Sequence, residues 1–304
     1  MEDNMRKGIA LALIAALISG FSVFMNGVAV KLADPVAYTI LKNVGAFALL
    51  GLIILACGEL GRIRSLTRRQ WATLAIIGLI GGSIPFAMFF YGLKLGGAAA
   101  SSFIFRSLFV FAGVFGYLIL KETPSPKDVA AGFAILIGNA LLISGGMQFG
   151  AGQLFVLGAT MLWALEYTIS RKALADIAPR TVMASRMLFG SLVLIAAMGF
   201  GGSMGSFASI GVETIQWLVL TSILLGAFMM AWYTSLKYLP VLKAASMLAL
   251  GGIVSAVLEM SFLGTAVTAL EAAGLFIILV GVAAIAWFAA FPRPRAAILQ
   301  ESGS

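Results

Sequence analysis

The sequence of 304 residues is 61% hydrophobic and only 11% charged, with a formal net charge of +8. Soluble domains average about 45–50% apolar and about 25% charged residues, so this composition excludes an ordinary soluble protein. The single cysteine, Cys57, excludes an internal disulfide, and the lack of histidine excludes imidazole metal sites, haem ligands and Ser-His or Cys-His nucleophiles. No Arg/Lys stripe alternates with aromatics, so we expect no nucleic-acid partner. The composition indicates a polytopic membrane protein.

Ten apolar runs are long enough to cross a bilayer as helices, since a hydrocarbon core about 30 Å thick needs roughly 20 helical residues. Proline residues stand near several boundaries of these runs, and the connections are too short for a separate soluble domain. The sequence therefore predicts an all-α integral membrane protein with ten transmembrane helices. In chain order, the expected spans are about 8–30, 35–57, 71–93, 97–119, 127–145, 152–171, 179–200, 213–236, 241–263 and 269–290.

The lysine and arginine residues predict the orientation of these spans. If the N-terminus is cytoplasmic, fifteen of them fall in cytoplasmic segments, whereas only Lys31 and Lys94 fall in the opposite loops. Cytoplasmic loops of membrane proteins carry an excess of positive residues, so both termini are expected in the cytoplasm. The fifteen are Arg6, Lys7, Arg62, Arg64, Arg68, Arg69, Lys121, Lys127, Arg171, Lys172, Arg180, Lys237, Lys243, Arg293 and Arg295.

The two halves of the chain echo one another at a spacing of 142–146 residues. Leu32-Ala33-Asp34 recurs as Leu174-Ala175-Asp176, Gln70-Trp71 recurs as Gln216-Trp217, and Lys42 is matched by Arg186. We therefore expect one five-helix repeat over residues 1–150, a second over 151–290, and a cytoplasmic tail over 291–304. Because five is an odd number, the second repeat inserts upside down relative to the first, an architecture that recurs in secondary transporters.

The end of each repeat carries a recognisable pattern. The first half has Leu120-Lys121-Glu122, a proline-containing turn, and then Gly132 and Gly138. The second half keeps Gly274 and Gly281 but has Leu263-Gly264-Thr265 at the place of the glutamate. The chain resembles the drug/metabolite transporter superfamily, as two tandem EamA domains, and more narrowly the YddG-type exporters of aromatic amino acids. This resemblance implies a basket of helices 1–4 and 6–9 around a central cavity, braced by helices 5 and 10.

Five charged residues lie within the expected spans: Lys42, Arg106, Glu166, Arg186 and Glu259. A charge at a helix centre costs about 2.5–3.5 kcal/mol on insertion scales, so we do not expect all five to face lipid. At about 1.5 Å per residue, Lys42 and Glu259 lie at similar depths on the outer side, as do Glu166 and Arg186 on the inner side. We expect each pair to form a gate. The alternatives are static ion pairs, or side chains that reach the nearer interface.

Two residues near the midplane are candidates for substrate binding. Arg106 lies about 14 Å deep without a partner at its own depth, and its guanidinium suits a carboxylate. Trp163 lies about 16 Å into its helix, whereas the other four tryptophans lie near helix ends. The alternatives are pairing with backbone carbonyls for Arg106 and core packing for Trp163. Ser101, Ser102 and Asn43 are expected to add polar groups to the cavity.

Glycine and proline cluster near the middle of three spans. We expect Gly81, Gly82, Pro85, Gly251 and Gly252 to act as hinges. The alternative is that the glycines only permit close helix packing, as the GxxxG spacing from Gly78 to Gly82 indicates.

The sequence contains neither a P-loop nor a potassium-channel filter, so transport must draw on a gradient. With the resemblance, it indicates a secondary transporter that exports amino acids, including aromatic ones, across the bacterial inner membrane by alternating access. The alternatives are an exporter of another small metabolite or drug, and an intramembrane lipid-modifying enzyme. We expect no enzymatic activity, cofactor or metal, and only a small-molecule substrate and the lipid bilayer as partners; a monomer is compatible with the sequence.

Overall fold

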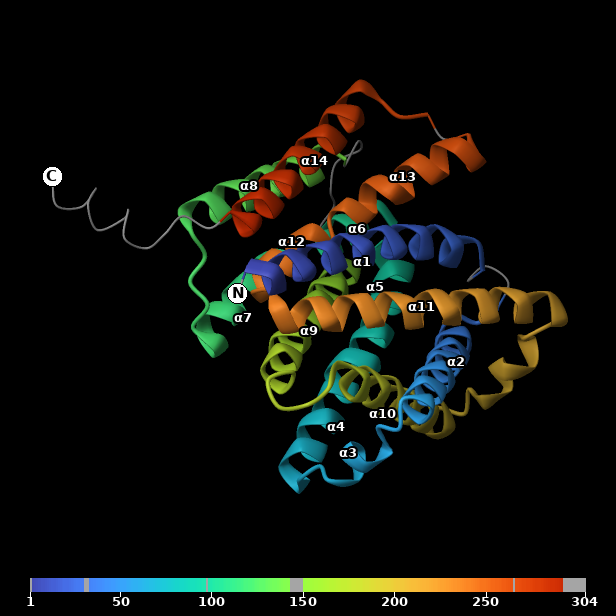
Figure 1. Ribbon diagram of the computed structural model, residues 1–304. Helices are drawn as coiled ribbons and strands as arrows, with labels where there is room; N and C mark the ends of the chain where they lie inside the picture. Colours follow the sequence, from blue (N-terminus) through green and yellow to red (C-terminus); the bar gives the residue numbers. More distant parts are fainter. Residues whose placement is uncertain (1, 30–32, 97, 143–149, 265, 292–304) are drawn as a thin grey trace, which may run out of the picture.

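The computed structural model describes residues 2–29, 33–96, 98–142, 150–264 and 266–291, and the regular structure of these residues is entirely helical (Figure 1). Within these residues, eight helical stretches, some of which join two of the helices given below, are long and apolar enough to cross a membrane. The first half contains α1 (Glu2–Ala29), α2 (Pro35–Ala56), α3 (Leu60–Arg64), α4 (Arg68–Gly82), α5 (Ile84–Gly96), α6 (Ala98–Arg106), α7 (Leu108–Leu120) and α8 (Pro126–Leu141). The second contains α9 (Ala151–Ala173), α10 (Pro179–Phe200), the 3₁₀-helix η2 (Met204–Ser209), α11 (Val212–Tyr238), α12 (Val241–Met247), α13 (Leu250–Leu263) and α14 (Ala269–Ala290).

The ten expected spans correspond to ten helical segments, three of which are interrupted. The third consists of α4 and α5, the fourth of α6 and α7, and the ninth of α12 and α13. The all-helical membrane fold is therefore confirmed, and the interruptions of these three segments are only one or two residues long. The fourth and ninth segments are related by the repeat, and both are interrupted near their middle.

The physical reasons for the interruptions differ. In the third segment, Pro85 lacks the N–H that would continue the helix from Gly82 through Ser83. In the ninth, Leu248 and Ala249 donate to carbonyls three residues back, so the backbone tightens into 3₁₀-type bonding there. Neither proline nor glycine marks the break at Ser107 in the fourth segment.

Large apolar side chains are exposed along the outer faces of the helices. Examples are Leu52 on α2, Phe133 on α8 and Phe276 on α14, which are 61–65% exposed. Lipid hydrocarbon solvates such side chains, whereas water does not. These outer faces therefore form the lipid-facing belt of the protein.

The two halves pack across one another. α1 packs on α11 and α13 of the second half, and α9 packs on α4, α5 and α7 of the first (Figure 1). The second helices of the two repeats, α2 and α10, contact each other, as do the last helices, α8 and α14. Each of these contacts that a helix of the first repeat makes has a counterpart made by the equivalent helix of the second repeat. A pseudo-two-fold relation between the repeats requires this symmetry.

The helices α8 and α14 meet at glycines. A Cβ atom added to Gly138 would lie 2.7 Å from the carbonyl oxygen of Gly274, and one added to Gly274 would lie 2.6 Å from that of Gly138. The backbones of α8 and α14 are therefore in direct contact at these glycines, and the two helices lie together along one edge of the bundle (Figure 1).

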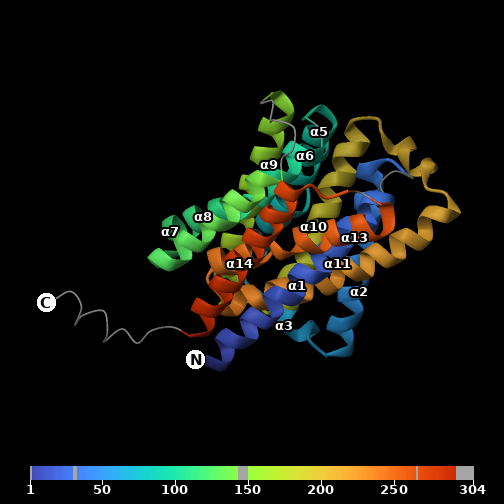
Figure 2. The same cartoon turned by 90° about the horizontal axis from the view of Figure 1, so that it is seen from above.

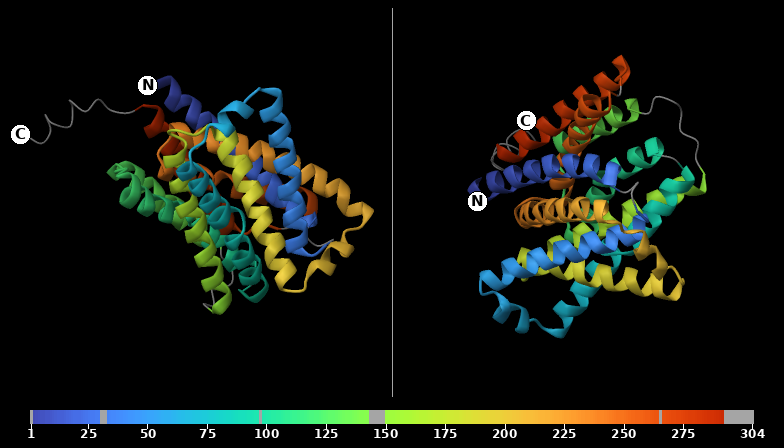
Figure 3. Two further views of the ribbon diagram at one scale, coloured as in Figure 1. Left: turned by 90° about the horizontal axis from the view of Figure 1, so that it is seen from below. Right: turned by 90° about the vertical axis from the view of Figure 1, so that its right-hand side faces the viewer.

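α1 begins and α14 ends on the same side of the molecule, which we call the N-terminal side (Figures 2 and 3). There Lys7 lies 5.5 Å from the ring centre of Tyr238, and Arg6 lies 5.9 Å from that of Phe291. Among the described residues, four ion pairs lie on this side and none on the opposite side. They are Glu122–Arg171, Glu59–Arg180, Asp128–Lys243 and Glu59–Arg62, at 2.8, 3.0, 3.4 and 3.7 Å.

Candidate polar centre and aromatic cluster

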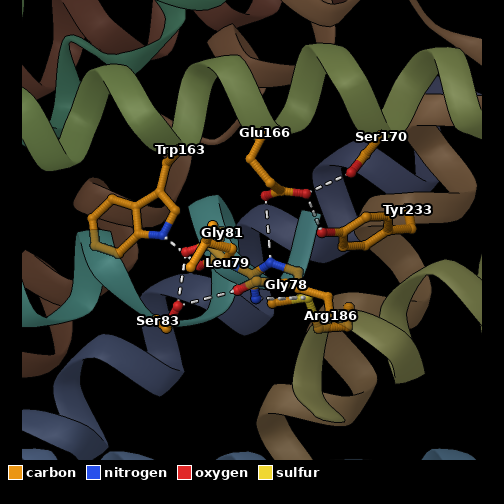
Figure 4. Close-up of polar contacts among 10 residues, drawn as sticks. Gly78, Leu79, Gly81, Ser83, Trp163, Glu166, Ser170, Arg186 and Tyr233 are labelled. Atoms are coloured by element: carbon orange, nitrogen blue, oxygen red, sulfur yellow. Dashed lines mark hydrogen bonds and ion pairs between the residues drawn. The ribbon is translucent and has the colours of Figure 1, made fainter. Parts of the chain in front are cut away.

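The break between α4 and α5 leaves one carbonyl group without a helical partner. In a continuous helix, the N–H of residue 85 would donate to the carbonyl oxygen of Gly81, but Pro85 has no N–H. Two side chains from other helices supply the missing bonds. Trp163 Nε1 donates to this oxygen at 3.0 Å, and Arg186 Nη2 donates at 2.7 Å (Figure 4). The expected hinge at Pro85 is thus also a connection point for α9 and α10.

Arg186 and Glu166 form a fully buried ion pair beside this carbonyl. Their Nε and Oε2 atoms lie 3.4 Å apart, and the side chains are 2% and 0% exposed. Two hydroxyl groups donate to Glu166 Oε1, from Ser170 at 2.5 Å and from Tyr233 at 2.7 Å (Figure 4). Two hydroxyl donors and the Arg186 charge offset part of the cost of taking this carboxylate out of water. We call Gly81, Glu166, Ser170, Arg186 and Tyr233 the polar centre.

Glycines permit the close approach that this centre requires. A Cβ on Gly81 would lie 2.4 Å from Cγ of Glu166 and 2.8 Å from Nε of Arg186. A Cβ on Gly82 would lie 2.6 Å from the carbonyl oxygen of Arg186, and Gly82 also faces Gly190. Both of these expected hinge glycines are therefore packing positions in this structure, and a hinge role stays a prediction.

Trp163 lies at the centre of an aromatic cluster. The rings of Phe86 and Phe105 lie 5.2 Å from it in edge-to-face geometry, and Phe89 lies 5.6 Å away. Only 6% of Trp163 is exposed, so its indole is a wall residue of this cluster and not a free stacking surface. Phe86 and Phe89 lie on α5 directly beyond the break at Ser83, and Phe105 lies near the end of α6, before the break at Ser107.

Arg106 follows Phe105 at the end of α6 and is partly exposed. It packs on α13, where a Cβ on Gly252 would lie 2.8 Å from Cζ of Arg106. No hydrogen bond or ion pair to the guanidinium occurs among the described residues, although Glu259, two turns further along α13, attracts it. Within the described part of the chain, the guanidinium of Arg106 is therefore not engaged in an ion pair, and it can accept an anionic ligand.

The structure does not bring Lys42 and Glu259 together. Lys42 Nζ donates to Asn26 Oδ1 at 3.3 Å and lies 5.9 Å from the ring centre of Tyr38, whereas Glu259 is exposed. Counting residues along each helix predicts a similar depth, but it does not predict the direction of the side chains around their helices. Glu166 and Arg186, which share a depth on the other side, do meet.

The remaining candidates are dispersed. Asn43 is fully buried in α2, and neither of its side-chain amide atoms has a hydrogen-bond partner among the described residues. Ser101 is buried in α6, and the side chain of Ser102 lies outside the described residues. Gly251 of α13 packs against Ala16 and Gly20 of α1.

Sequence reasoning missed the two hydroxyl donors to Glu166. Ser170 lies one helical turn beyond Glu166, and this spacing was a usable signal. Tyr233 is 67 residues away on α11, and nothing in the sequence connects it to Glu166. The Gly81 carbonyl could have been found from Pro85, since a proline within a helix frees the carbonyl four residues before it.

Comparison with known proteins decides the family. The model of the EamA-like transporter family matches residues 6–144 and 150–287. The chain belongs to the EamA-like transporter family. This result confirms the expectation of two tandem EamA domains and makes the protein a membrane transporter; the narrower resemblance to aromatic amino-acid exporters stays a prediction.

Two relatives of this EamA-like transporter differ in how much of the chain they match. It is 24% identical over 285 residues to the uncharacterized transporter YyaM of Bacillus subtilis (strain 168). The matched region covers 88% of this chain and 92% of that protein. It is 26% identical over 176 residues to the inner membrane protein YtfF of Escherichia coli (strain K12), over 53% of each chain. A crystal structure 18% identical in sequence matches with a TM-score of 0.75 over 91% of this chain and 97% of that chain, so the fold is shared.

Proposed function

We propose that this EamA-like transporter exports amino acids, including aromatic ones, across the bacterial inner membrane by alternating access. The observation that carries the proposal is the adjacency of an aromatic cluster and a cation that forms no ion pair among the described residues. Arg106 directly follows Phe105, whose ring is part of the cluster around Trp163. An aromatic amino acid offers a carboxylate for the cation and a ring for the cluster.

The two features contribute differently to recognition. Arg106 presents a planar guanidinium, which can bind a carboxylate with two parallel hydrogen bonds. Edge-to-face ring contacts contribute about 0.5–1.5 kcal/mol beyond area burial. The carboxylate therefore determines the class of substrate, and the rings determine the preference within the class.

The polar centre supplies one of the two gates that alternating access needs. Glu166 and Arg186 are fully buried and join α9 and α10 to the α4–α5 break and to α11. In our proposal this closed arrangement seals the N-terminal side, which is the cytoplasmic side by the distribution of basic residues. Opening that side separates the two residues.

Transport by the purified protein in proteoliposomes tests the proposal. We expect exchange of labelled phenylalanine and tryptophan at a higher rate than that of alanine, with phenylalaninamide excluded because it lacks the carboxylate. Empty liposomes provide the background rate. Equal rates for phenylalanine and its amide, or transport only of substrates without an amino-acid group, would show a different small-molecule cargo.

A further inference from the structure

The two repeats keep an exact register over their first two helices. α1 ends at Ala29 and α9 at Ala173, α2 begins at Pro35 and α10 at Pro179, and α2 ends at Ala56 and α10 at Phe200. Around these boundaries and within α2 and α10, each position in the second repeat is therefore 144 residues beyond its equivalent in the first. By this register, Ser22 is the equivalent of Glu166, Asn26 of Ser170, and Lys42 of Arg186.

The hydrogen bonds of the two sets follow the same plan. In the second repeat, Ser170 Oγ donates to Glu166 at 2.5 Å, one turn back along α9. In the first, Asn26 Nδ2 donates to Ser22 Oγ at 3.0 Å, one turn back along α1. A basic side chain from the second helix of each repeat completes each set. Lys42 Nζ lies 3.3 Å from Oδ1 of Asn26, the equivalent of Ser170, whereas Arg186 Nε lies 3.4 Å from Oε2 of Glu166, the equivalent of Ser22.

The sets differ in their charge. Arg186 has the carboxylate of Glu166 as its counter-ion, but Ser22 occupies the equivalent position in the first repeat, and Lys42 contacts Asn26. Among the described residues, Lys42 forms no ion pair, although it is only 9% exposed. A buried ammonium without a counter-ion is costly, and one amide oxygen and a ring face offset only part of that cost.

We propose that Lys42 binds the carboxylate of the transported substrate, at the position that the Glu166 carboxylate occupies in the other repeat. The substrate then completes a polar centre that the first repeat leaves without its acid. The Ser22 hydroxyl, which accepts a hydrogen bond from Asn26 Nδ2, donates its own hydrogen to this carboxylate. This inference rests on the proposed function, which requires a carboxylate substrate.

The site lies nearer to the side opposite the N-terminal side than Arg106 does. Arg106 packs on Gly252, and the neighbouring Gly251 contacts Gly20 of α1, so Arg106 is level with about residue 20 of α1. Asn26 lies six residues further along α1, which corresponds to about 9 Å of helix. The carboxylate would pass from Arg106 to Lys42 as the substrate moves outward. Lys42 thus serves the last binding step before release.

Installing the missing acid tests this inference. The variant Ser22→Glu places a carboxylate where the second repeat has one, and Ser22→Gln is the matched neutral control. We expect Ser22→Glu to occupy Lys42 internally and to slow phenylalanine transport about tenfold or more relative to Ser22→Gln, because the substrate must displace a tethered carboxylate. Equal transport rates in the two variants would overturn the inference.

A second measurement does not depend on the identity of the substrate. The thermal midpoint of the purified protein should be higher for Ser22→Glu than for Ser22→Gln, and this difference should vanish when Lys42→Met is added. Asn26→Asp provides the same comparison with a smaller change, because Asn26 Oδ1 already lies 3.3 Å from Lys42 Nζ. If neither acid stabilises the protein through Lys42, no carboxylate site exists there. If both do, but the wild type transports no amino acid, the site stands and the proposed function fails.

Discussion

Trp163 and Arg186, which lie on different helices, donate hydrogen bonds to the same carbonyl oxygen of Gly81, at 3.0 and 2.7 Å. The aromatic cluster and the buried ion pair are therefore joined at one backbone atom. A movement of the α4–α5 break changes both at once. The side chains that we propose to bind substrate and the side chains that we propose to close the N-terminal side are thus mechanically linked.

Replacing the proline that creates this shared acceptor should uncouple the two groups. In Pro85→Ala, the new N–H can donate to the Gly81 carbonyl, and it then competes with Trp163 and Arg186. We expect a lower transport rate with an unchanged or higher thermal midpoint, because a proline is removed from a helix. Pro126→Ala is the control, since Pro126 occupies the first turn of α8, where no helical bond is lost. A transport rate equal to that of the control would contradict the role of the acceptor.

Gly81 itself tolerates no side chain. We expect Gly81→Ala to destabilise the protein by about 1–3 kcal/mol, since its Cβ would overlap atoms of the buried ion pair. Gly51→Ala on α2 is the matched control, because a Cβ there meets nothing within 4 Å. Thermal unfolding in detergent measures both. Equal midpoints for the two variants would show that Glu166 and Arg186 relax without cost.

The buried ion pair should show strong coupling. Glu166→Gln leaves the Arg186 charge buried and uncompensated, and such a loss typically costs about 3–5 kcal/mol. We expect Glu166→Arg and Arg186→Glu each to abolish transport, and their combination to recover part of it. The same exchange between Lys42 and Glu259 should give additive losses, since these residues form no ion pair in this structure. Additive losses at Glu166 and Arg186 as well would remove the proposed gate.

Arg106 and Trp163 should affect different substrates. Arg106→Gln removes the cation, so transport of all free amino acids should fall, with about 2–5 kcal/mol lost in substrate binding. Trp163→Phe removes the indole donor and part of the aromatic cluster, so tryptophan transport should fall more than alanine transport. Competition assays in proteoliposomes measure both preferences. If both variants keep the wild-type preference while folded, the substrate does not bind at this cluster.

The orientation of the chain is open to a direct test. Both termini are expected in the cytoplasm, so a C-terminal alkaline phosphatase fusion should be inactive and a fluorescent protein fusion bright. A phosphatase fusion after Gly264, between α13 and α14, should be active, because that turn lies on the opposite side. Reversed activities at these two positions would overturn the proposed topology.

The helical segments follow from the sequence more closely than their interruptions do. The spans at 179–200 and 269–290 coincide with α10 and α14, because Pro179 and the Thr268 cap fix their starts. The break at Ser107 has no such marker. Its amide still bonds to Phe103 and Ile104, so the chain deviates little from a helix there, and packing rather than local sequence determines the break.

The candidate site shows the same division. Depth along a helix can be counted from sequence, and it places Glu166 and Arg186 at one level, where they meet. The direction of a side chain around its helix depends on tertiary packing, and for this reason Lys42 faces Asn26 instead of Glu259. Tyr233 contacts Glu166 only because α11 crosses α9, a relation that no sequence spacing encodes.

The exchange of partners between the repeats also bears on how the chain is assembled in the cell. α1 finds its main neighbours on α11 and α13, which emerge from the ribosome about 200 residues after it. Until then, the glycine-lined faces of the first five segments have no partner except lipid. A chain truncated after α8 would therefore lack the main packing partners of both α1 and α8.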